Sequence, residues 1–168
     1  ARPDLLDLIA YGVERGLRFT LSTNGTLITA DVARQLSVAG LIYAGVSIDG
    51  PEELHDRQRC EVGAFRASIE GLRNLGAAGV RRGVRFTVTP GNLAGVDDVL
   101  ALVEQEGIER FCLYHLVPSG RGGSLEDITL EERRGVLARV FAFADSHPDV
   151  EVLTVDNPSD GPALLHWL

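Results

Sequence analysis

Polar side chains that could bind a ligand follow the short apolar stretches of this sequence. They supply hydroxyls, an amide, carboxylates, imidazoles and guanidinium groups, which suit a polar ligand such as a ribose joined to an amino-acid head group. If the apolar stretches are parallel strands, these side chains share one rim of the sheet. The set comprises Ser22, Thr23, Asn24, Ser47, Asp49, His55, Asp56, Arg59, Thr87, Thr89, Tyr114, His115, Ser119 and Arg121.

Several of these residues also have a purely structural explanation. Asn24 precedes a glycine and is a common turn former. Ser47 is small enough to be there for its fit, and Asp49 begins an Asp-Gly-Pro turn. His55 and Asp56 could be a solvated pair in a loop. The sequence alone leaves both explanations open.

A glycine-rich stretch, residues 119–123, could bind an anion with its backbone N–H groups. It lacks the lysine and the spacing of a phosphate-binding loop, which argues against nucleotide hydrolysis. Arg121 within it could hold a carboxylate through the two-pronged geometry of a guanidinium group. A mobile surface arginine is the alternative.

The elements that position these residues show a two-residue alternation. From residue 44 to 49, apolar side chains at even positions alternate with small or polar ones at odd positions, and residues 17–24 and 84–89 alternate similarly. Helical patterns separate the stretches, which favours parallel strands joined by crossovers. A strand between two helical layers would be apolar on both faces, so the polar face is expected to line a cavity. The sequence therefore predicts an α/β fold, a parallel β/α barrel or part of one.

The strands are predicted to begin near residues 17, 41, 83, 110 and 150, with helices over 3–15, 30–39, 65–78, 96–106 and 130–146. Thr29 is the expected N-cap of the second helix. Thr129 and Glu132 are spaced as a capping box for the last of these helices. The charged residues 52–61 are predicted to form a loop, as are residues 156–162.

Composition narrows the possible functions. The net charge of −8, without a basic stripe, argues against a nucleic-acid partner. The apolar runs are too short to cross a bilayer and no signal peptide is visible, so we expect no membrane partner and a cytoplasmic location. Cys60 and Cys112 are too far apart for a metal-binding pair, and we expect one exposed and one buried thiol. The chain has no Met, even at position 1, and we expect it to be an internal piece of a longer protein.

Five short segments carry a family resemblance. Residues 22–27 (Ser-Thr-Asn-Gly-Thr-Leu), 46–51 (Val-Ser-Ile-Asp-Gly-Pro) and 55–59 (His-Asp-x-x-Arg) resemble the middle of radical S-adenosylmethionine (SAM) enzymes, in the branch with an extended C-terminal domain and auxiliary iron–sulfur clusters. Residues 114–122 and 153–161 are similar to the members that act on siroheme-derived tetrapyrroles, in heme d1 synthesis and in the siroheme route to heme.

The resemblance implies a partial TIM barrel of six strands, of which this chain is roughly strands three to six. Residues 1–148 would be the central barrel and 149–168 the start of the C-terminal extension. It also implies SAM and a [4Fe–4S] cluster as cofactors, with a reductant protein as partner. The three-cysteine loop of the family is not in this sequence, so no metal ligand and no catalytic residue is assigned here, and the chain alone is expected to be inactive.

The resemblance also divides the rim into a cofactor side and a substrate side. Asn24, Ser47 and Arg59 correspond to the SAM contacts, with Arg59 near the SAM carboxylate. The residues expected to face the substrate are Asp49, His115 and Arg121.

The function expected for the parent protein is removal of a carboxylate-bearing group from a tetrapyrrole side chain, by decarboxylation or deacetylation, in heme or heme d1 biosynthesis. One alternative keeps the fold and makes the substrate a peptide, as in the maturases of quinone cofactors and sulfatases. A second alternative is a non-catalytic, degenerate barrel that only binds a ligand or partner.

Overall fold

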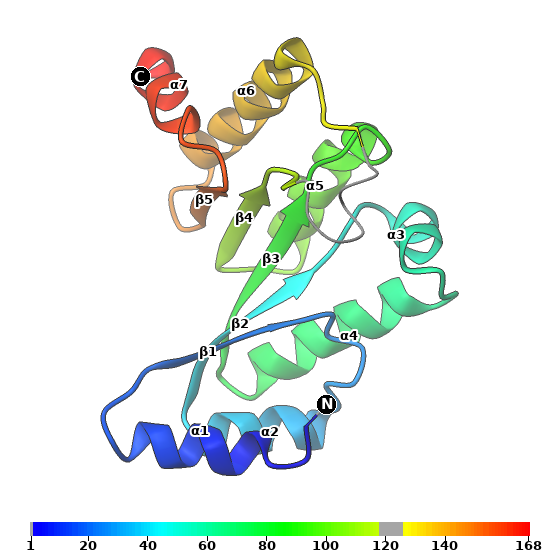
Figure 1. Ribbon diagram of the computed structural model, residues 1–168. Coiled ribbons are helices and arrows are strands. Elements are labelled where there is room, and N and C mark those ends of the chain that lie inside the picture. Colours follow the sequence, from blue (N-terminus) through cyan, green and yellow to red (C-terminus); the bar gives the residue numbers. More distant parts are fainter. Residues whose placement is uncertain (1, 118–125) are drawn as a thin grey trace.

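The computed structural model describes residues 2–117 and 126–168 (Figure 1). Its strands form one sheet in the order β1-β2-β3-β4-β5. These are β1 (Phe19–Thr23), β2 (Leu41–Ser47), β3 (Arg81–Thr87), β4 (Arg110–Tyr114) and β5 (Glu151–Val155). The helices are α1 (Leu5–Val13), α2 (Ala30–Val38), α3 (Glu52–Arg59), α4 (Ala64–Ala77), α5 (Val96–Gln105), α6 (Leu130–Ser146) and α7 (Asp160–Trp167), with a short 3-10 helix at Leu93–Gly95. In the ranges described, none of these helices has both the length and the apolar character needed to cross a membrane.

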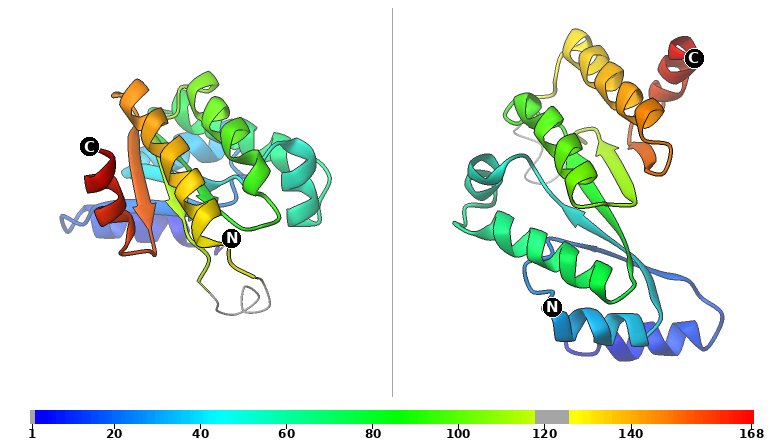
Figure 2. Two further views of the ribbon diagram at one scale, coloured as in Figure 1. Left: turned by 90° about the horizontal axis from the view of Figure 1, so that it is seen from above. Right: turned by 180° about the vertical axis from the view of Figure 1, so that it is seen from behind.

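Every neighbouring pair of strands is parallel, and the order in the sheet is the order in the sequence. Figure 2, in the view from behind, shows α4 and α5 in front of the strands, whereas Figure 1 looks onto the opposite face of the sheet. A twisted parallel sheet with helices along its outer face is the geometry of part of a β/α barrel. The predicted α/β class and partial barrel are confirmed.

The alternation predicted for β2 sets the two faces of the sheet. Ala44, Val46 and Ile48 are fully buried in the core between the sheet and the helices. Ser47 is the next residue along and points to the other face, since successive side chains of a strand alternate. The polar residues at odd positions therefore lie on the open face, as predicted.

Two helix caps appear where the sequence predicts them. The Thr29 hydroxyl accepts the Val32 N–H at 3.3 Å and caps α2. Thr129 and Glu132 form a reciprocal capping box at the start of α6, in which each side chain accepts the backbone N–H of the other residue. Each cap satisfies a backbone donor that has no partner inside its helix.

Residues 52–61, predicted to be a loop, instead form α3 up to Arg59. A helix is predicted from the sequence by its stripe of apolar residues, and α3 has no such stripe. It is favoured by two glutamates in its first turn and two arginines in its last, which complement the helix dipole. The predicted loop at 156–162 is also partly wrong, because α7 begins at Asp160.

The C-terminal strand β5 continues the same sheet, with Val155 opposite Tyr114 of β4. The division of the chain at residue 148 into barrel and extension stays a prediction.

Gly71 of α4 lies directly against the turn that follows β1. A Cβ atom at this position would stand 2.3 Å from the backbone oxygen of Gly25, which no side-chain rotation could relieve. One turn earlier, the Ser68 hydroxyl donates to the backbone oxygen of Asn24 at 2.7 Å. These two contacts of α4 hold the turn that presents Asn24.

We predict that Gly71→Ala lowers the free energy of unfolding by about 1–3 kcal/mol, because the added methyl group overpacks a backbone contact. Gly135 of α6 is the control, since a Cβ there meets no atom within 4 Å. Gly135→Ala should raise stability by about 0.5–1 kcal/mol, as expected for an exposed helical glycine. Urea unfolding measures both changes, and equal effects of the two substitutions would contradict the packing of α4 on this turn.

Candidate functional site

The ends of the parallel strands bring the predicted rim residues to one edge of the sheet. Ser47 ends β2, Thr87 ends β3 and Tyr114 ends β4, while Asn24 directly follows β1. Strand register aligns Thr87 with Tyr114. Three of these side chains, those of Ser47, Thr87 and Tyr114, share the open face.

The carboxylate of Asp49 is held by Arg59 from the end of α3. Arg59 donates Nε–H to Oδ2 at 2.5 Å and Nη2–H to Oδ1 at 3.0 Å. The Asp49 side chain is 6% exposed and that of Arg59 is 35% exposed. The structure thus joins a residue predicted to face the substrate and one predicted to bind the cofactor in a single ion pair. Both oxygens of the Asp49 carboxylate accept hydrogen bonds from Arg59, so the role of Asp49 is to position that guanidinium group.

His55 locks the backbone at the same point. The Asp49 N–H donates to His55 Nδ1 at 3.0 Å, so that nitrogen is unprotonated and the ring carries its proton on Nε2. Burial lowers the pKa of His55, against the opposing effect of the Asp49 carboxylate. The ring packs edge-on against Phe65 of α4 with a centroid distance of 5.8 Å.

Asp56 caps the next helix. Its Oδ2 accepts the Gly63 N–H at 2.6 Å and its Oδ1 accepts the Phe65 N–H at 2.8 Å. These two bonds lower the pKa of the Asp56 carboxyl group. The His-Asp-x-x-Arg segment therefore ties α3 to the end of β2 and to the start of α4, which explains its spacing.

Asn24 is exposed and participates in a turn. Its Oδ1 accepts the Thr26 N–H at 3.3 Å and the Thr26 hydroxyl at 3.2 Å. This orientation leaves the amide Nδ2 as the donor available to a ligand. These contacts support the structural explanation of Asn24 as a turn former. Its role in binding the cofactor stays a prediction.

His115 is 3% exposed and lies on the helix side of β4, in phase with Phe111 and Leu113. Its Nε2 is 2.7 Å from Asp160 Oδ2 at the start of α7, and Asn157 donates to the other oxygen of that carboxylate at 2.8 Å. The structure thus buries His115 under α7, away from the open face. Its predicted contact with substrate has no support in this arrangement.

Arg121, Ser119 and the rest of the predicted anion-binding stretch at 119–123 lie outside the residues that the structure describes. Their predicted roles stay predictions.

The open face also carries residues that sequence reasoning did not select. Tyr43 of β2 lies across β3, where Gly83 leaves room for it, since a Cβ there would stand 2.0 Å from the phenol oxygen. Burial raises the pKa of Tyr43 to about 12. Arg85 of β3 stacks over the ring of Tyr114 at 4.5 Å. The alternation of residues 84–89 placed Arg85 on the polar face, and that signal was available in the sequence.

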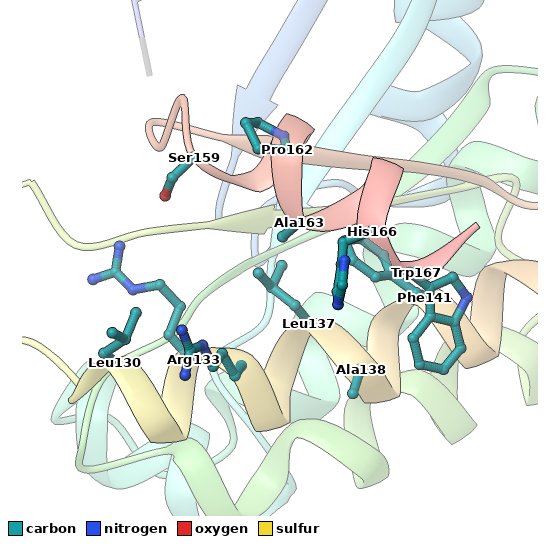
Figure 3. Close-up of a pocket in the computed structure, with 11 residues that line it drawn as sticks. Leu130, Arg133, Leu137, Ala138, Phe141, Ser159, Pro162, Ala163, His166 and Trp167 are labelled. Atoms are coloured by element: carbon teal, nitrogen blue, oxygen red, sulfur yellow. The ribbon is translucent and has the colours of Figure 1, made fainter.

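A groove of about 560 Å³ between α6 and α7 lies elsewhere (Figure 3). Leu137, Phe141 and Trp167 give it an apolar lining. None of the predicted site residues lines it. This groove is where α7 packs on α6, and it is separate from the rim.

Residues for an iron–sulfur cluster are not found in this chain. Its two cysteines stand apart, Cys60 exposed at the end of α3 and Cys112 buried in β4, as predicted. Residues 2–117 and 126–168 contain no cluster of three or more potential metal-binding side chains. A [4Fe–4S] cluster needs a set of thiolates that these two cysteines do not supply.

We predict that stability falls as the pH drops through the range in which His55 titrates. Because its pKa is lowered by folding, the unfolded chain binds more protons below about pH 6.5, and acid favours unfolding. His55→Asn removes this titration and keeps an acceptor for the Asp49 N–H. Its melting temperature should therefore fall less than that of the wild type between pH 7 and pH 5.

The exposed His166 provides the matched control, since His166→Asn should keep the pH dependence of the wild type. If His55→Asn and the wild type lose stability in parallel, the neutral, accepting state of His55 is wrong.

Comparison with known proteins identifies the family of this chain. The model of the radical SAM superfamily matches residues 1–105. The Fe-coproporphyrin III synthase of Methanosarcina barkeri is 44% identical over 169 residues, covering 97% of this chain and 42% of that protein. The AdoMet-dependent heme synthase of Oleidesulfovibrio alaskensis is 43% identical over 145 residues, covering 84% of this chain and 37% of that protein. The chain thus spans about two fifths of the length of these relatives.

A more distant relative is the mycofactocin maturase MftC of Mycobacterium tuberculosis, 35% identical over 124 residues, with coverage of 72% of this chain and 31% of that protein. Among solved structures, Streptococcus suis SuiB bound to precursor peptide SuiA covers 96% of this chain and 38% of its own, with a TM-score of 0.77 and 15% identity. That likeness concerns the fold. The family match over residues 1–105, on a parallel sheet with its polar rim, shows that the chain belongs to the radical SAM superfamily.

Proposed function

We propose that this chain is the central part of an enzyme that removes a carboxylate-bearing group from a siroheme-derived tetrapyrrole, in heme or heme d1 biosynthesis. The observation that carries the proposal is the extent of its similarity to the two heme-related synthases, over 97% and 84% of the chain. The mycofactocin maturase matches less of the chain at lower identity.

The rim fits SAM through three of its residues. Two guanidinium nitrogens of Arg59 hold Asp49, which leaves Nη1 to donate to a ligand carboxylate. Ser47, half-buried at the end of β2, supplies a hydroxyl, and Asn24 supplies the Nδ2 donor. We therefore assign Asp49 to holding Arg59 in place.

SAM and a reduced [4Fe–4S] cluster supply carbon-radical chemistry when bound, and the cluster's ligands would come from outside this chain's two cysteines. The residues described above bind and orient the cofactor's amino-acid and ribose groups. Arg121 remains a candidate for substrate contact within this proposal, whereas His115, which is buried and paired with Asp160, does not. The proposed function also requires a partner protein that donates electrons to the cluster.

The principal alternative is a peptide substrate. The similarity to the mycofactocin maturase and the fold shared with a peptide-bound enzyme favour it. Both alternatives use the same rim, so the substrate has to be tested directly.

The test uses the complete protein, reconstituted anaerobically with iron and sulfide and reduced. It is offered SAM together with siroheme or its decarboxylated derivative, and mass spectrometry follows both products. We expect 5′-deoxyadenosine and a tetrapyrrole lighter by one carboxyl or one acetate group. SAM cleavage that leaves every tetrapyrrole unchanged would contradict the proposal of a tetrapyrrole substrate. A protein that forms no cluster and binds no SAM would favour the non-catalytic barrel.

In the same protein, Ser47→Ala and Asn24→Ala should each weaken SAM binding by about 2- to 10-fold, the effect of one lost hydrogen bond of roughly 0.5–1.5 kcal/mol. The visible spectrum of the cluster should not change, because neither side chain is a thiolate that could ligate iron. Equilibrium dialysis with labelled SAM measures the affinity.

Ser37→Ala is the control, since Ser37 is a half-buried serine of α2, outside the rim. If both rim variants bind SAM as tightly as this control, the cofactor side of the rim is assigned incorrectly.

A further inference from the structure

The open face of the sheet carries three arginines with different surroundings. Arg81 and Arg85 lie two pleats apart on β3, and Arg110 lies on β4 in register with Gly83. Arg81 and Arg110 both pair with Glu151 of β5, at 2.7 and 2.8 Å. Within residues 2–117 and 126–168, Arg85 forms no ion pair and no side-chain hydrogen bond. It is the cation on this face that no described carboxylate neutralises.

Arg85 is nevertheless held in place. Its stem passes over Gly45 of β2, where an added Cβ would stand 2.7 Å from Cδ. Its guanidinium carbon lies 4.5 Å from the centroid of the Tyr114 ring, a distance at which a cation is attracted to the ring face. Its backbone is in register with Ser47, at the level of the rim. The group is half-buried and fixed at the depth where a ligand on the open face would lie.

Such an arrangement suits an anionic ligand with a flat ring system. An arginine is always protonated, and a half-buried one gains from a carboxylate that meets its two-pronged edge. Tyr114 offers aromatic surface beside it, while the ring of Tyr43, farther down the same face, is stacked under Arg110 at 4.3 Å.

We propose that Arg85 binds a carboxylate of the tetrapyrrole substrate from the floor of the open face. The inference rests on the proposed function, because it takes the substrate to be a tetrapyrrole. It adds a specificity residue that is distinct from the cofactor contacts at Ser47 and Arg59.

The test measures binding of iron coproporphyrin III to the complete, anaerobically reconstituted protein by its absorption change. The tetramethyl ester of the same compound, in the same detergent, is the uncharged probe. Arg85→Gln should weaken binding of the acid by about tenfold or more, as for loss of a hydrogen bond between charged groups, and binding of the ester by less than about twofold. Arg81→Gln, on the same strand and face but paired with Glu151, should leave both affinities within about twofold of the wild type.

Equal binding of the acid by Arg85→Gln and the wild type would overturn this inference and leave the proposed function intact. The same holds if Arg85→Gln weakens SAM binding instead, or weakens the acid and the ester alike. A wild-type protein that binds neither probe would overturn both. If Arg85→Gln does not fold, as judged by circular dichroism, Arg85→Lys replaces it. That variant keeps the charge and loses the two-pronged edge, so it should still lower affinity for the acid alone, and unchanged affinity would overturn the inference.

Discussion

The two-faced alternation of β2 is the constraint on which the rest of the structure depends. A strand directs successive side chains to opposite faces, so one sequence of small and apolar residues can serve a core and a cavity together. Val46 and Ile48 are fully buried on the helix side. The opposite face carries Gly45, over which the side chain of Arg85 passes, and Ser47 at the rim. A slip of one residue in register would reverse both faces at once.

The ion pair between Asp49 and Arg59 extends this arrangement beyond the strand. The carboxylate is nearly inaccessible to solvent, and a buried charge is tolerated only with a partner and hydrogen bonds. Arg59 provides the partner from α3, and His55 fixes the adjacent backbone. Asp56 then connects the same helix to α4. One short segment thus positions a guanidinium group at the rim and joins three elements of the fold.

Much of the fold could be predicted from the sequence because apolar periodicity reports it directly. The strands, their parallel order and the caps at Thr29 and Thr129 all follow from local pattern. Helix α3 could not, because it has almost no apolar face and is favoured by charges at its two ends. Its absence from the prediction also hid the pairing of Asp49 with Arg59, which requires the helix to return the chain to the strand end.

The candidate site was predicted less completely than the fold. Residue types at strand ends identify a rim, but they do not say which side chains have partners there. His115 is engaged by Asp160, which lies 45 residues later in the sequence. His115 alternates with Phe111 and Leu113 on the helix side of β4, so its placement could have been predicted from the sequence. The isolation of Arg85 could not, since it depends on Glu151 serving Arg81 and Arg110.

The central claim is that the open face of this sheet supports radical chemistry on a tetrapyrrole side chain. The most direct measurement supplies the complete protein with a tetrapyrrole that is deuterated in its acetate and propionate side chains, and determines the mass of the 5′-deoxyadenosine released. The account predicts that deuterium from the side chain appears in 5′-deoxyadenosine as the tetrapyrrole is converted. Unlabelled 5′-deoxyadenosine, formed beside an unchanged tetrapyrrole, would contradict it.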